Sequence, residues 1–150
     1  MAIPVTLHLL AAVIWVGGMF FSLLVLRPCC MEMEPPVRLA LMSKAVTRFF
    51  KWVWLAVGTL LLTGYWMTFV NFADFADLHW HIDAMLMIGN LMAVIFLVAF
   101  FGPYQKMRAA LASGDNPGAG ARLNDIRRLI MANLSLGLPL VIIGSLGRYI

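Results

Sequence analysis

The chain has 150 residues, of which 63% are hydrophobic and only 12% are charged. Because soluble domains carry about 25% charged residues, this composition excludes an ordinary soluble protein and indicates that lipid solvates part of the surface. The net charge of +4 would also fit a nucleic-acid binder, but the basic residues gather on one side of the apolar segments, and membrane topology explains that pattern.

Four apolar segments follow one another, at about 3–26, 50–70, 83–103 and 126–147. Each is close to the roughly 20 residues that a helix needs to cross a bilayer, and a helix satisfies its own backbone groups in lipid. The first segment lacks a preceding basic stretch and a clear cleavage site, so we interpret it as a retained span. These features predict a single all-α domain over 1–150, an integral membrane four-helix bundle.

The basic residues predict the orientation of the bundle. All but one of the 11 Lys and Arg residues lie in the connections between the first and second spans and between the third and fourth, or in the first residues of the span that follows; the exception is Arg148. The positive-inside rule assigns that side to the cytoplasm. We therefore expect an N-out/C-out protein of the bacterial inner membrane, with the lipid bilayer as its main partner and no nucleic acid.

Proline and glycine residues predict where the helices begin, bend and end. Pro35-Pro36 fits a helix start that continues into the second span, and the turn sequence at 113–118 predicts a sharp connection. Pro139 predicts a kink in the fourth span. Three residues of the first half also have counterparts in the second: His8 matches His81, Pro28 matches Pro103, and Arg48 matches Arg127. This weak pattern predicts an internal two-helix repeat, and chance similarity is the alternative.

The three histidines, His8, His79 and His81, all lie toward the outer side. An ionisable residue in a membrane helix indicates a functional site by default, although an interfacial hydrogen bond is the simpler interpretation. Imidazoles on facing helices can hold a cofactor in a bundle core. We therefore predict His8 and His81 as axial ligands of a haem b iron, and Arg148 as a partner of its propionates.

Soft ligands give an alternative, a copper site. Cys29 and Cys30 lie at the inner end of the first span, and His79 and His81 lie near Met85 at the outer side. Thiolate and thioether sulfurs suit Cu(I), while the simpler interpretation of the methionines is apolar packing. The adjacent cysteines do not predict a disulfide. Asp83 and Asn90 share a helix face, away from His81, where Asp83 fits a helix start or a proton relay.

The segment from His8 to Phe21, HLLAAVIWVGGMFF, resembles the first span of the bacterial CopD family (copper resistance protein D). Residues 48–54, 63–67, 102–104 and 126–129 resemble its later spans, so the resemblance covers nearly the whole chain and implies copper handling. The pattern is also similar to the HemJ-type protoporphyrinogen oxidases. That resemblance implies a haem b site at His8 and His81 and adds Trp15, but Asp83 replaces the lysine of the family's His-x-Lys.

We therefore predict a membrane haem b protein with a redox or electron-transfer role near the outer face. A quinone or a redox protein would be its partner, and a haem-dependent oxidoreductase is the corresponding enzyme class. Copper binding or transport is the first alternative. An accessory subunit of a membrane complex is the second, and a homo-oligomer is compatible with each of these functions.

Overall fold

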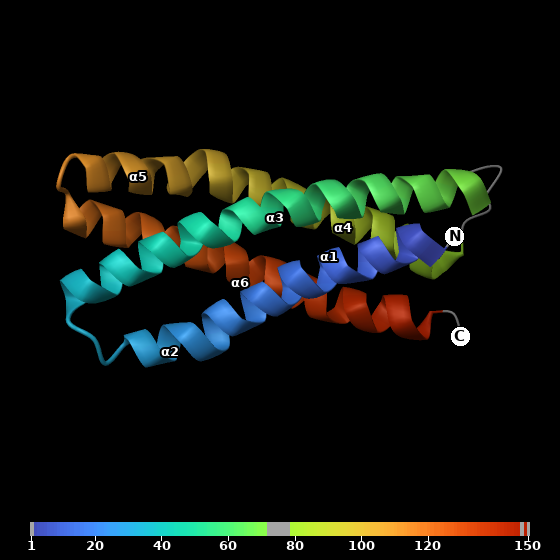
Figure 1. The fold of residues 1–150 in the computed structure, drawn as a ribbon, viewed down its shortest axis with the longest axis horizontal. Coiled ribbons are helices and arrows are strands. Elements are labelled where there is room, and N and C mark those ends of the chain that lie inside the picture. Colours follow the sequence, from blue (N-terminus) through green and yellow to red (C-terminus); the bar gives the residue numbers. More distant parts are fainter. Residues whose placement is uncertain (1, 72–78, 148, 150) are drawn as a thin grey trace.

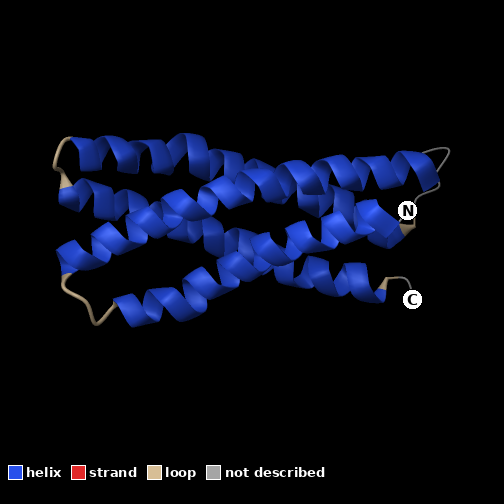
Figure 2. Ribbon diagram, in the orientation of Figure 1, coloured by secondary structure: helices blue, strands red, loops and turns tan. Residues whose placement is uncertain are grey.

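The computed structural model describes residues 2–71, 79–147 and 149, and these form a bundle of antiparallel helices (Figures 1 and 2). The described residues contain helices and turns but no strand. This confirms the predicted all-α fold. The elements in chain order are α1 (Ala2–Phe20), η1 (Phe21–Leu26), α2 (Arg27–Cys30), α3 (Pro35–Asn71), α4 (Trp80–Ala99), η3 (Phe100–Tyr104), α5 (Gln105–Ala112) and α6 (Asn116–Leu146).

Four continuous helical stretches in the described residues are long and apolar enough to cross a membrane. They run over Ala2–Cys30, Pro35–Val70, Trp80–Ala112 and Asn116–Leu146. Their outer faces expose large apolar side chains such as Leu62, Met87 and Phe101. Lipid can cover such faces without cost, whereas water cannot. The chain is therefore a multi-pass membrane protein, as its composition predicts.

Different elements form the two ends of the bundle (Figure 1). We call one the basic end: it holds α2, α5 and the first turns of α3 and α6. We call the other the histidine end: there α1 begins, α3 ends, α4 begins at Trp80 and α6 ends at Leu146. Because basic residues accumulate on the cytoplasmic side of membrane proteins, the basic end is the one that we expect to face the cytoplasm.

The two halves have the same order of elements, which supports the predicted repeat. Each half is a long helix, a π-helical segment, a short helix, a turn and a second long helix. Pro28 follows the first π-helical segment and Pro103 lies within the second. A proline ring clashes with the carbonyl four residues before it, and the wider π turn relieves that clash. In each half the two long helices pack mainly against each other, α1 against α3 and α4 against α6.

The connection between α5 and α6 is built by its turn residues, as expected. Gly114 adopts a positive φ of 76°, a conformation that glycine accepts at little cost. The Asp115 side chain accepts a hydrogen bond from the Gly118 amide at 2.9 Å and so caps α6. The helix then continues through Pro139 to Leu146 without interruption.

Replacing Asp115 by alanine should lower the free energy of unfolding by about 1 kcal/mol, because the Gly118 amide loses its acceptor. Thermal unfolding in detergent would measure the change. Asp125→Ala is the control, since Asp125 only joins an exposed ion pair with Arg122, and such pairs contribute little. Equal losses in both variants would contradict the capping role.

Candidate functional site

His8 lies on the inward face of α1, where Ala11 and Trp15 are buried at the next two positions of the same stripe. Its Nδ1 atom is 2.8 Å from the Thr63 hydroxyl oxygen on α3. A Cβ atom at the neighbouring Gly64 would lie 3.4 Å from the ring carbon Cε1. The glycine therefore lets the imidazole lie close against the backbone of α3, and the hydroxyl fixes its direction.

The hydrogen bonds of Thr63 favour one proton arrangement of His8. The threonine hydroxyl donates to the Thr59 carbonyl at 2.6 Å, which is shorter than its contact with the imidazole. A hydroxyl has a single proton, so with that proton on the carbonyl, its oxygen accepts from His8 Nδ1–H. The neutral ring then has its lone pair on Nε2. A metal-binding histidine is commonly oriented in this way by a partner at its other nitrogen.

His81 lies in the first turn of α4 and packs against the end of α6. A Cβ atom at Gly147 would overlap the Cβ and Cγ atoms of His81. The Nδ1 atom of His81 is buried and has no hydrogen-bond partner among the described residues. Buried polar atoms are almost always paired. An unpaired imidazole nitrogen in an apolar contact is therefore a candidate position for a ligand.

Met85 and His79 extend the surroundings of His81. Met85 is four residues further along α4, on the same face, and a Cβ at Gly144 would lie 3.5 Å from its Sδ atom. His79 immediately precedes α4 in an extended conformation and is exposed. The centroids of the His79 and His81 rings are 5.8 Å apart. Three predicted copper ligands thus lie at the start of α4, at the histidine end.

The two predicted haem ligands contact different helices. His8 faces Thr63 on α3, whereas His81 faces Gly147 beyond α6. Trp15 is buried and makes an edge-to-face contact with Phe96, with ring centroids 6.5 Å apart. Arg148, the predicted propionate partner, lies outside the described residues. The assignment of these four residues to haem stays a prediction.

Cys29 and Cys30 lie at the basic end, so the predicted soft ligands divide into two groups at opposite ends of the bundle (Figure 1). Cys29 is exposed and Cys30 is buried, and neither forms a disulfide. In the part of the chain that the structure describes, no three His, Cys, Asp or Glu side chains meet as a metal site. A cluster at the histidine end would therefore depend on the thioether of Met85.

Asp83 and Asn90, which share a face of α4 in the sequence, have different surroundings in the structure. Asp83 is exposed, on the side opposite to the half-buried His81, as its two-residue offset predicts. Asn90 donates to the Leu86 carbonyl at 2.7 Å and to the Tyr65 hydroxyl at 2.9 Å. The second contact joins α4 to α3. Asn90 therefore links two spans, a role that the sequence does not reveal.

Thr63 and Gly147 are the site residues that sequence reasoning missed. Thr63 precedes Gly64 in an apolar span, and a hydroxyl at that position was the available signal. A threonine in a membrane helix most often bonds its own backbone, as this one does with Thr59. Gly147 follows the last apolar span, where a glycine usually indicates only a helix end.

The comparisons with known proteins identify a family. Residues 43–146 match the family model described as copper resistance protein D, CopD. No curated protein and no solved structure matches the chain. Because the family model covers more than half of the residues, from α3 to the end of α6, the chain belongs to the CopD family.

Proposed function

We propose that this CopD-family chain binds Cu(I) at its histidine end and handles copper at that face of the membrane. The observation that carries the proposal is the buried Nδ1 atom of His81, which has no hydrogen-bond partner among the described residues and lies one helical turn from Met85 on the same face of α4. Imidazole nitrogen and thioether sulfur are both ligands that copper accepts, and the thioether favours Cu(I).

The surroundings of this pair fit a site that takes up an ion from outside. His79 is exposed at the start of α4 and its ring lies 5.8 Å from that of His81. It can meet an ion first and share it with His81. Gly144 and Gly147 carry no side chains that would occupy the space beside Met85 and His81. These contacts leave Met85 next to the backbone of α6 and His81 next to the backbone just beyond it.

A Cu(I) titration of the detergent-purified protein against a chromogenic Cu(I) chelator, under reducing conditions, tests the proposal. We expect one ion per chain, and Met85→Leu should weaken binding at least about tenfold because a ligand is lost. Met87→Leu is the matched control, since Met87 lies two residues away and is 73% exposed. Equal affinities of the two variants, or no binding by the natural chain, would refute the site.

Haem b is the second candidate, and His8 favours it. The hydrogen bond to Thr63 leaves the Nε2 lone pair of this ring available for iron, as the resemblance to the HemJ-type proteins also implies. A redox role with a quinone or redox protein would belong to this candidate. Absorption spectra before and after dithionite distinguish the two. A Soret band that shifts on reduction and is lost in His8→Ala would favour haem, whereas a colourless protein favours copper.

A further inference from the structure

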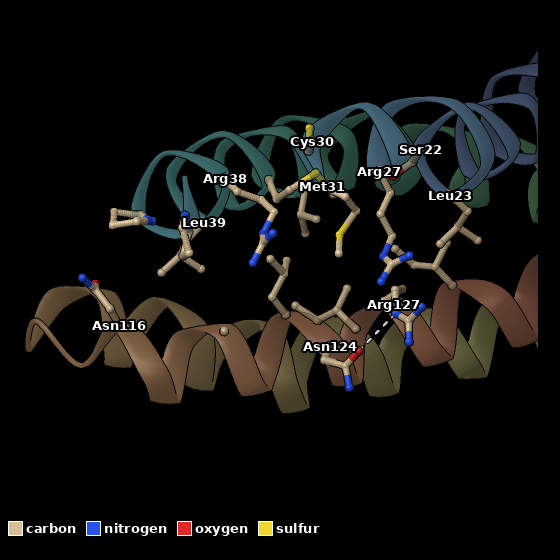
Figure 3. A pocket seen from close by; sticks show the side chains of 18 of the residues that line it. Ser22, Leu23, Arg27, Cys30, Met31, Arg38, Leu39, Asn116, Asn124 and Arg127 are labelled. Atoms are coloured by element: carbon tan, nitrogen blue, oxygen red, sulfur yellow. Dashed lines mark hydrogen bonds between the residues drawn. The ribbon is translucent and has the colours of Figure 1, made fainter. Parts of the chain in front are cut away.

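A cavity of about 480 Å³ lies at the basic end, opposite to the proposed copper site. Its walls come from η1, α2 and the start of α3 on one side and from the first half of α6 on the other (Figure 3). Much of the lining is apolar, including Leu23, Leu39, Val46, Ile126 and Ile130. The space therefore has room and surface for hydrocarbon.

Three arginines from three different elements line the same cavity: Arg27 from α2, Arg38 from α3 and Arg127 from α6. All three are half-buried. Figure 3 shows Arg27 and Arg38 pointing from the upper helices toward α6, where Arg127 lies below Arg27. The fold thus brings together cations that are up to 100 positions apart in the sequence.

No carboxylate forms an ion pair with these three guanidinium groups within the described residues, where the pair of Arg122 with Asp125 is the only one. Arg127 donates from Nε to the Asn124 amide oxygen at 3.1 Å, which orients it without removing its charge. Like charges in a half-buried space repel one another more strongly than in water. A bound anion would reverse this repulsion.

We propose that this cavity holds the phosphodiester headgroup of an anionic phospholipid, with its acyl chains along the apolar lining. Guanidinium groups match phosphate oxygens with paired hydrogen bonds. Basic pockets between membrane helices are known to suit anionic headgroups on the cytoplasmic side, where the charge pattern places this end. The apolar walls favour a lipid over free phosphate, which has no hydrocarbon to bury.

Lipid retention measured by native mass spectrometry tests the proposal. The full chain is reconstituted with equal amounts of phosphatidylglycerol and phosphatidylcholine, then released from the membrane mimetic. We expect the natural chain to retain phosphatidylglycerol several-fold more often, as a single bound lipid. An equal retention of both lipids, or of neither, would overturn the proposal without any variant.

Matched charge-removing variants then locate the site. Arg27→Gln combined with Arg127→Gln should abolish the preference for phosphatidylglycerol. Arg108→Gln combined with Arg128→Gln should keep it, because both residues are exposed and lie outside this cavity. An equal loss in both double variants would assign the preference to general surface charge and overturn the proposal.

Two further measurements remove the remaining alternatives. Millimolar inorganic phosphate should leave the retained lipid in place, and displacement by phosphate would show a free-anion site instead. Arg127→Lys keeps the charge but not the planar fork, so it should fold and retain less phosphatidylglycerol than the natural chain. Unchanged retention in that folded variant, together with unchanged retention in the glutamine pair, would refute binding by these arginines.

Discussion

Replacing Asn133 by aspartate should destabilise the bundle by about 3 kcal/mol, since a carboxylate in the middle of a membrane helix costs about that much. Asn133 is buried on α6 and donates from Nδ2 to the Met92 carbonyl of α4 at 3.1 Å. Aspartate at neutral pH has no proton to donate, so two oxygens would face each other across this helix contact.

The carbonyl oxygen of the Asn133 side chain increases the expected loss of stability. Its Oδ1 atom is buried and has no partner among the described residues, so a charged oxygen at that position would also lack a donor. Equilibrium unfolding in mixed detergent and denaturing micelles would measure the loss of free energy.

Two controls separate charge from shape. Asn133→Leu should change the stability much less, because removing both polar groups leaves no buried charge. Asn124→Asp introduces the same charge at an exposed position of the same helix, where Arg127 can pair with it, and should cause no comparable loss of stability. If Asn133→Asp were as stable as Asn133→Leu, water would have to reach residue 133 between α4 and α6, and the burial of this side chain would be contradicted.

The helices themselves could be predicted because few backbone conformations other than a helix are stable in lipid. Runs such as the one from Ile3 to Leu26 have no hydrogen-bond partner for an unpaired backbone, so a helix follows from composition. The starting proline of α3 and the turn at Gly114 could be read from their residue types.

The partners of the candidate ligands could not be predicted in the same way. In a soluble helix the polar face shows which side turns inward, but lipid and core are both apolar, so this signal is weak in a membrane helix. The rotation of α1 that turns His8 toward Thr63 therefore could not be read from its own residues. It depends on Gly64, which lets the ring approach α3.

The arginine-lined cavity shows a second limit. Arg27, Arg38 and Arg127 were each explained by the positive-inside rule, which concerns only the side of the membrane. Their convergence depends on how α2, α3 and α6 pack around one cavity. A topological rule thus accounts for the side on which a charge lies, while the packing of the helices determines which charges share a space.

Replacing Gly18 by leucine should lower the free energy of unfolding by about 1–3 kcal/mol, the usual cost of overfilling a packed contact. Even a Cβ atom at Gly18 would overlap the ring of Phe49 on α3. Phe49 is partly buried and packs against the buried core. Its ring would have to leave that contact, or the two long helices of the first half would have to separate.

The adjacent glycine provides the control for this prediction. Gly17 is exposed, and a Cβ there would meet nothing within 4 Å, so Gly17→Leu adds the same side chain to the same helix on a face that lipid can cover. Thermal unfolding of both variants in one detergent compares them directly. We expect Gly18→Leu to unfold at the lower temperature, because only its side chain enters the contact with α3. Equal unfolding temperatures would mean that α1 and α3 do not pack through Gly18, and the position of His8 against α3 would lose the support of that contact.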